Sequence, residues 1–149
     1  MDRLALSIPP GEIFGLVGPA GAGKTTTMRL LTGVMQPTTG SVKVLGLEIT
    51  RDPEAVRHRI GYVPQNSGLY ADLTVLENLQ FHADLFGIPR AERDRKAAEL
   101  LAFSRLEPFA KRLCRNLSGG MRQKLALCAA LIPRPEGLFL DAPPIGVDP

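Results

Sequence analysis

The stretch GPAGAGKT, residues 18–25, constrains the fold of this chain more than any other part of its sequence. It follows a short apolar run over residues 13–17, of the kind that forms a buried strand. It leads into a helical pattern over residues 24–32, which Gly33 is placed to end. A glycine-rich loop between a buried strand and a helix predicts an α/β fold.

The same stretch satisfies the pattern GxxxxGK[ST], which suits the binding of a nucleoside triphosphate. Glycines let consecutive backbone N–H groups point inward around phosphate oxygens, and the start of the following helix favours an anion. Lys24 can reach the β- and γ-phosphates, and the Thr25 hydroxyl can ligate Mg²⁺. The alternative is an ordinary glycine-rich turn, which the position between strand and helix disfavours. The predicted nucleotide-binding residues are Gly18, Pro19, Ala20, Gly21, Ala22, Gly23, Lys24, Thr25 and Thr26.

The rest of the chain predicts a sheet interrupted by a helical insertion. Thr74 followed by Glu77 makes a capping box at the start of one helix, and Ser118 is placed to begin another. The expected strands are residues 4–8, 13–17, 41–45, 60–63 and 137–140. The expected helical segments are residues 24–32 and 53–59, a segment from about 71, residues 91–103, and a segment from about 118. We therefore expect one incomplete domain over residues 1–149, with a core of about 1–69 and 133–149 and a helical subdomain of about 70–132.

Asp141 ends the apolar run LFLD and is the second chemical element of the sequence. A carboxylate that leaves a strand beside a phosphate-binding loop can hold Mg²⁺ through water. An aspartate after an apolar run is commonplace, so a role for Asp141 in binding Mg²⁺ depends on the motifs that accompany it.

Those motifs resemble the ATP-binding cassette (ABC) ATPases. LSGGM, residues 117–121, resembles the signature motif of that family. The order of the phosphate loop, GYVPQ, LSGGMRQKL, LFLD and GVDP also matches the family, from about residue 7 to residue 149. The resemblance implies a P-loop NTPase of the ABC ATPase type: an α/β sheet core with a helical signature subdomain, incomplete at both ends.

The resemblance implies roles for particular residues. Gln65 matches the glutamine that senses Mg²⁺ and the attacking water and touches the transport partner. Ser118, Gly119 and Gly120 match the signature residues that clamp the γ-phosphate held by the opposite protomer. Asp148 matches the D-loop aspartate, which communicates across the dimer.

The resemblance also implies cofactors and partners. The ligand is ATP, and the protein ligands of its Mg²⁺ are Thr25, Gln65 and Asp141. In this family two nucleotide-binding domains pack head to tail around ATP, so a second such domain is implied, in a homodimer or a heterodimer. Hydrolysis occurs only within that pair.

Residues 67–88, SGLYADLTVLENLQFHADLFGI, and the stretch IGVDP resemble the exporter branch of multidrug or ABC-2 type. There the helical insertion docks on a membrane permease, which would place the chain peripherally at the cytoplasmic face of the membrane. The longest apolar run, residues 125–132, falls far short of the roughly 20 residues that span a bilayer. A formal net charge of +3 without a dense Lys/Arg block gives no indication of a nucleic-acid partner.

Ala142 departs from the family pattern, which places a glutamate there as general base. A methyl group neither accepts a proton nor orients water, while the contacts to phosphate and Mg²⁺ lie elsewhere. The leading function is an ATP-binding component that couples ATP to transport. The alternatives are a hydrolysis-deficient ATP-binding partner or a degenerate fragment, and lastly a non-transport ABC ATPase.

Two family features fall outside the chain: an adenine-stacking aromatic upstream and a switch histidine after the D-loop. His58 and His82 lie in the wrong regions to replace that histidine, and solvent-facing or packing roles are expected for both. We expect a fragment of a longer gene, a degenerate copy or an incomplete gene model, and a chain that is aggregation-prone when expressed alone. Cys114 and Cys128 are expected to be reduced, structural thiols.

Overall fold

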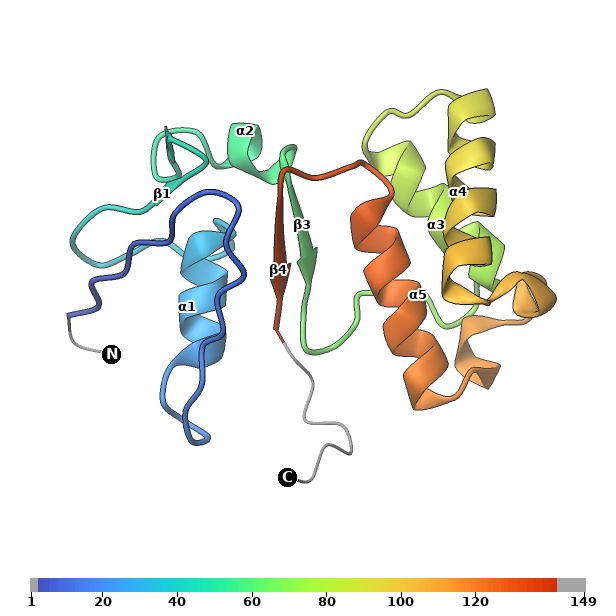
Figure 1. Ribbon diagram of the computed structural model, residues 1–149, viewed down its shortest axis with the longest axis horizontal. Coiled ribbons are helices and arrows are strands. Elements are labelled where there is room, and N and C mark those ends of the chain that lie inside the picture. Colours follow the sequence, from blue (N-terminus) through green and yellow to red (C-terminus); the bar gives the residue numbers. More distant parts are fainter. Residues whose placement is uncertain (1–2, 142–149) are drawn as a thin grey trace.

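The computed structural model of the chain describes residues 3–141 (Figure 1). The predictions made for Ala142 and Asp148 lie outside these residues. In chain order the elements are α1 (Lys24–Leu31), β1 (Lys43–Val44), β2 (Leu47–Glu48), α2 (Pro53–Arg57), β3 (Ile60–Val63), α3 (Val75–Leu85), α4 (Arg90–Ser104), α5 (Gly119–Leu131) and β4 (Gly137–Leu140). Two 3₁₀ turns, Glu107–Phe109 and Cys114–Asn116, connect α4 to α5.

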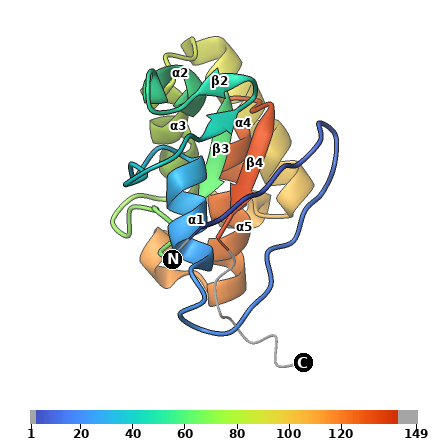
Figure 2. The ribbon, with the colours of Figure 1, turned by 90° about the vertical axis from the view of Figure 1, so that its left-hand side faces the viewer.

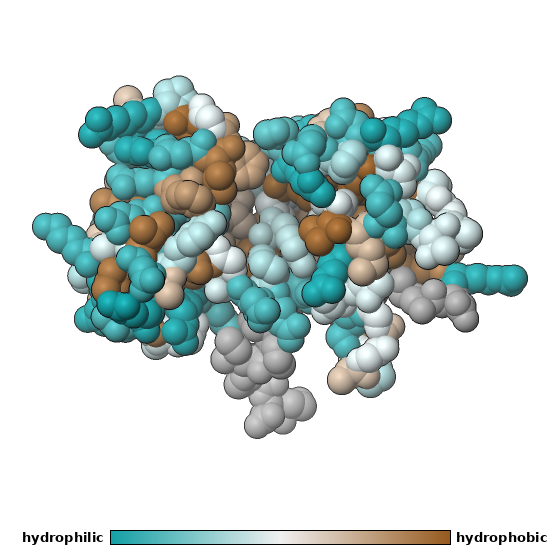
Figure 3. Space-filling view, turned by 180° about the vertical axis from the view of Figure 1, so that it is seen from behind, coloured by the Kyte–Doolittle hydropathy of each residue, from teal (hydrophilic) through white to brown (hydrophobic). Residues whose placement is uncertain are grey.

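The elements form two lobes on either side of the parallel pair β3–β4 (Figure 1). One lobe holds α1, α2 and the antiparallel hairpin of β1 and β2, and the other holds α3, α4 and α5. The turned view keeps α1 in front of the strands and α5 behind them (Figure 2). Seen from behind, the surface is hollowed between the lobes (Figure 3).

The helical lobe forms as its sequence predicts. Thr74 and Glu77 make the reciprocal capping box at the start of α3, and Ser118 caps α5. The packed faces of α3, α4 and α5 bury Leu79 and Leu125 completely. Cys114 and Cys128 are free thiols buried in the same core, which confirms their expected structural role.

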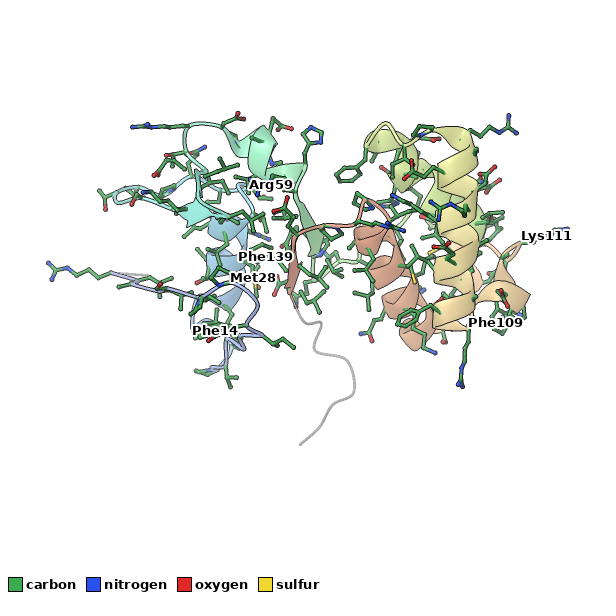
Figure 4. All side chains as sticks on the ribbon, turned by 45° about the horizontal axis from the view of Figure 1, so that its top comes forward. Phe14, Met28, Arg59, Phe109, Lys111 and Phe139 are labelled. Carbon is green, nitrogen blue, oxygen red and sulfur yellow. The ribbon has the colours of Figure 1, made fainter. Side chains whose placement is uncertain are left out.

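The other lobe has a smaller core. Val44, Ile49, Val56 and Ile60 are its buried members, and Phe139 of β4 packs against them from the strand side. Figure 4 places Phe139 and Met28 between β4 and α1. This packing holds α1, which follows the glycine-rich loop, beside the end of β4.

Two predicted strands are wrong, and a third is shorter than predicted. Residues 4–8 and 13–17 are irregular chain, with Ile13 103% and Val17 94% exposed. Within the described residues β4 pairs with β3 alone, and neither segment has a strand beside it to complete a ladder. Apolar composition favours a strand only where a partner strand supplies hydrogen bonds. The strand expected over residues 41–45 is reduced to β1.

Gly61 lets the two lobes approach each other. A Cβ atom at this position would lie 2.6 Å from the backbone oxygen of Ala130 in α5. The same atom would meet Leu138 at 3.0 Å and Pro135 at 3.1 Å. The helix that begins at the signature motif is therefore seated directly on β3, because β3 has no side chain at this point.

Candidate nucleotide-binding site

The glycine-rich loop adopts backbone conformations that only glycine takes readily. Gly21 and Gly23 have φ of +82° and +91°, in the left-handed region. The Ala22 N–H donates to the Pro19 carbonyl at 3.2 Å, which closes the turn between them. The loop is thus a compact turn that ends at the first residue of α1.

The start of α1 suits an anion. Gly23 is the N-cap residue and supplies no side-chain acceptor, so the first N–H groups of the helix face the loop. Lys24 folds back over the loop and its Nζ donates to the carbonyls of Gly18 and Pro19, the second at 2.7 Å. Its ammonium therefore lies at the loop, where a phosphate group would be held.

Thr25 and Asp141 meet at the end of β4. The Thr25 hydroxyl donates to Asp141 Oδ1 at 3.3 Å, although 116 positions separate them in the sequence. Asp141 is 8% exposed, and its Oδ2 is buried without a hydrogen-bond partner among residues 3–141. Buried carboxylate oxygens rarely lack a partner, and an unpaired one calls for an ion, a water or a ligand.

The register of β3 and β4 brings Gln65 to the same edge. Val63 pairs with Leu140, and the Asp141 N–H donates to the Val63 carbonyl at 2.9 Å. Gln65 follows two residues after β3 and is exposed. A cavity of about 380 Å³ opens here, and the polar residues that line it are Thr25, Arg29, Tyr62, Gln65, Asn66 and Asp141.

Arg29, Tyr62 and Asn66 are site residues that the sequence reasoning missed. Arg29 follows Thr25 by one helical turn, so it lies on the same face of α1, a spacing visible in the sequence. Burial raises the pKa of the Tyr62 hydroxyl, the charge of Asp141 raises it further, and the charge of Arg29 lowers it. Tyr62 therefore stays neutral between a cation and an anion at the cavity.

The residues present fit a magnesium ion carried by a nucleotide. No group of three His, Cys, Asp or Glu side chains able to hold a metal occurs within residues 3–141. The site instead offers one carboxylate beside a hydroxyl, which differs from a cluster of three protein ligands. It suits Mg²⁺, which keeps several waters and takes further oxygens from phosphates. Asp141 and Thr25 meet this description, and Gln65 lies at the same cavity.

The predicted signature residues lie apart from the loop. The Ser118 Oγ accepts the Met121 N–H at 3.2 Å, so the α5 N-terminus is capped as expected, and Gly119 and Gly120 have open space around them. This end of α5 lies at the same edge as the loop but on the far side of β3 and β4 (Figures 1 and 2). The structure does not bring the signature residues to the phosphate loop of the same chain.

The fold and the loop define the class: an α/β nucleotide-binding domain whose phosphate loop joins an irregular segment to a helix, with an acidic residue at the end of a neighbouring strand. A family model described as ABC transporter matches residues 1–144. The chain belongs to the ABC transporter family, as an ATP-binding domain, and the predicted family and fold are confirmed.

Curated relatives cover the whole chain. It is 48% identical to the probable multidrug ABC transporter ATP-binding protein YbhF of Escherichia coli K12, and spans 27% of that protein. It is 43% identical to the Nod factor export ATP-binding protein I of Cupriavidus metallidurans and spans 49% of it. The chain thus spans half or less of the length of these relatives.

Solved structures of ABC transporter ATP-binding domains have the same fold as this chain. The dimeric structure of MJ0796, a bacterial ABC transporter cassette, matches 96% of this chain with a TM-score of 0.83 and 31% identity, and the match covers 66% of that chain. An ATP-binding subunit of an ABC transporter matches 89% of this chain with a TM-score of 0.76 and 34% identity, over 55% of its own length. No helix within residues 3–141 is long and apolar enough to cross a membrane.

Proposed function

We propose that this chain binds Mg-ATP at residues 18–26 and couples that binding to export through a membrane permease. The observation that carries the proposal is the Asp141 carboxylate beside the Thr25 hydroxyl, at the start of the helix that follows the phosphate loop. Its buried Oδ2 has no partner within the described part of the chain. The names of the relatives, which concern multidrug transport and Nod factor export, support an exporter.

Each part of the site has one task in this proposal. Backbone N–H groups of the loop and the start of α1 hold the β- and γ-phosphates, and the Lys24 ammonium neutralises them. Thr25 and Asp141 hold Mg²⁺, with Gln65 at the same cavity. When bound, Mg²⁺ supplies charge neutralisation at the phosphates. Arg29 places a cation in the wall of that cavity.

The proposal includes a second nucleotide-binding domain. Ser118, Gly119 and Gly120 form a capped helix N-terminus, which favours an anion, yet it lies across the sheet from the loop of its own chain. A head-to-tail dimer brings this end of α5 to the ATP of the partner domain. The Ser118 hydroxyl proton remains available there, because among the described residues its oxygen acts only as acceptor in the cap.

The partner in the membrane is proposed to contact the helical lobe near α3. Tyr70 and Phe81 form an edge-to-face pair with ring centroids 4.7 Å apart, His82 lies beside both rings, and Leu85 is 62% exposed. Accessible aromatic and aliphatic side chains of this kind are typical anchors in protein interfaces. The chain would then be peripheral at the cytoplasmic face of the membrane, held there by the permease.

A hydrolysis-deficient role is the second candidate, because Ala142 stands where the family has its general base. Removing a general base lowers a rate by about 10²–10⁴-fold. The bound nucleotide would then act by holding the dimer closed, and turnover would fall to a partner domain with an intact glutamate.

Calorimetry with Mg-ATP on the folded chain tests the proposal. We expect Mg²⁺-dependent affinity that is lost in Lys24→Ala, and negligible ATPase turnover that rises in Ala142→Glu. Tight binding with negligible turnover in the parent chain would favour the hydrolysis-deficient role, and no gain of turnover in Ala142→Glu would mean that Ala142 is not what limits hydrolysis. Absence of Mg²⁺-dependent affinity in folded protein would contradict both candidates.

A further inference from the structure

A second cavity lies in the helical lobe, away from the nucleotide site. It has a volume of about 290 Å³ and lies between the C-terminal end of α4 and one face of α5. Its walls include Phe103, Leu127 and Leu131, with Arg105 and Lys124 as its charged members. None of these residues contributes to the phosphate loop, the magnesium ligands or the aromatic group near α3.

The apolar part of this cavity is partly open. Phe103 is 78% exposed, although it belongs to a helix whose other face is buried in the core of the lobe. Leu127 and Leu131 are half-buried and lie one helical turn apart on α5, so they form one continuous strip. An exposed phenylalanine beside two leucines on the rim of a hollow is a place for an apolar side chain to insert.

The two cations of the cavity have no acidic partner within residues 3–141. Arg105 and Lys124 are both exposed, and neither takes part in an ion pair or side-chain hydrogen bond of the described chain. α5 contains no acidic residue, and Glu99 of α4 is already paired with Arg95 at 3.1 Å. Two uncompensated positive charges beside an apolar hollow select a negatively charged ligand.

The backbone at Arg105 is strained. Arg105 ends α4 with φ of 60° and ψ of 32°, the left-handed conformation that glycine normally takes at a helix C-terminus. Its N–H donates to the Ala102 carbonyl at 3.2 Å, and the next N–H, of Leu106, donates to Leu101 at 3.0 Å. A side chain with a Cβ is strained here, so replacing Arg105 by glycine should relieve the strain.

We propose that this cavity, lined by Phe103, Arg105, Lys124, Leu127 and Leu131, docks a segment of a partner protein in which an apolar side chain is flanked by carboxylates. The apolar side chain fills the hollow between α4 and α5, and the carboxylates pair with Arg105 and Lys124. The site can hold about one large side chain, which favours a short peptide segment over an extended anionic surface such as a membrane. This inference does not depend on the proposed nucleotide chemistry.

The test is a selection of short random peptides displayed on phage against the full chain, with folding monitored by circular dichroism. We expect the selected peptides to combine aspartate or glutamate with leucine, phenylalanine or another large apolar residue. A synthetic peptide with the selected sequence is then titrated by fluorescence anisotropy. We expect Arg105→Gly and Lys124→Gln each to weaken its binding by about two- to fivefold, as for single exposed ion pairs.

Arg105→Gly separates this role from a structural one, because relief of the backbone strain should raise the thermal midpoint while binding weakens. Lys43→Gln, the same loss of charge at an exposed position on β1, should leave the affinity unchanged. Selected peptides without acidic residues, or equal affinity in Arg105→Gly and the parent chain, would overturn the proposal. The proposal would also be overturned if no peptide bound and the chain instead bound phosphatidylcholine–phosphatidylglycerol vesicles through Arg105 and Lys124.

Discussion

The Thr25 hydroxyl and the Asp141 carboxylate are joined by a hydrogen bond of 3.3 Å, which links the helix after the phosphate loop to the strand that carries the acidic residue. The contact occupies one carboxylate oxygen and leaves the other buried, with no partner in the range that the structure describes, residues 3–141. A hydroxyl and a carboxylate held together in this way are arranged for a shared cation. The link also makes the position of α1 depend on the end of β4.

Thr25→Val should weaken Mg-ATP binding about tenfold, which corresponds to about 1.4 kcal/mol. Valine has nearly the same shape as threonine but lacks the hydroxyl that we assign to Mg²⁺. Titration calorimetry in the presence of Mg²⁺ and of EDTA measures the effect, which should vanish without the metal. Thr50→Val, at an exposed turn of the β1–β2 lobe, is the matched control and should bind normally. Equal affinities in the two variants would remove Thr25 from the site.

Asp141→Asn should leave the ligand-free chain as stable as the parent or more stable, while the stabilisation by Mg-ATP is lost. A buried oxygen without a partner costs about 1–3 kcal/mol, and the amide removes its negative charge while keeping an acceptor for Thr25. Thermal unfolding with and without Mg-ATP gives both quantities. A variant that unfolds earlier without ligand would show that the carboxylate supports the fold rather than the ligand.

The order of the motifs predicted the family, and local patterns predicted the helices. Thr74 with Glu77 and Ser118 are N-cap signals that act within four residues, so the sequence alone locates the starts of α3 and α5. The glycines at 21 and 23 likewise report a loop conformation that depends only on their own φ angles. These features need no distant partner to form.

The errors concern features that depend on distant parts of the chain. Residues 13–17 have the composition of a buried strand, but a strand exists only beside another strand, and composition does not say which neighbour is present. Arg29 and Tyr62 reach the cavity because α1 packs beside the end of β4 and because β3 pairs in parallel register with it. The sequence shows the spacing of Arg29 from Thr25, but it does not show the packing of α1 or the register of β3 that bring Arg29 and Tyr62 to one cavity.

Gly61→Ala should destabilise the chain by about 1–3 kcal/mol, because the new methyl group would lie 2.6 Å from the Ala130 carbonyl oxygen. That oxygen belongs to helix backbone, so α5 must shift away from β3 to make room. Urea unfolding measures the change. Gly15→Ala is the control, since a Cβ there meets nothing within 4 Å and its φ is not positive, so its midpoint should not fall. Equal urea midpoints for Gly61→Ala and the parent chain would mean that α5 can move away from β3 without loss of stability.

Cys114 and Cys128 should make the stability of the helical lobe decrease at alkaline pH. Burial raises the pKa of both thiols, so above the ordinary thiol pKa of about 8.5 the unfolded chain loses these protons before the folded chain does. Their contribution is therefore complete below that pH and is lost as the pH rises toward the raised values.

Urea midpoints of the parent chain and of a Cys114→Ala, Cys128→Ala double variant, compared between about pH 7.5 and 10, measure this contribution, because other titrating groups cancel in the difference. The parent should lose more stability than the variant over this range. The same burial predicts that 5,5′-dithiobis(2-nitrobenzoic acid) reacts with neither thiol in the folded chain and with both in denaturant. Rapid reaction of either thiol without denaturant would place it at the surface and remove the basis of the alkaline effect.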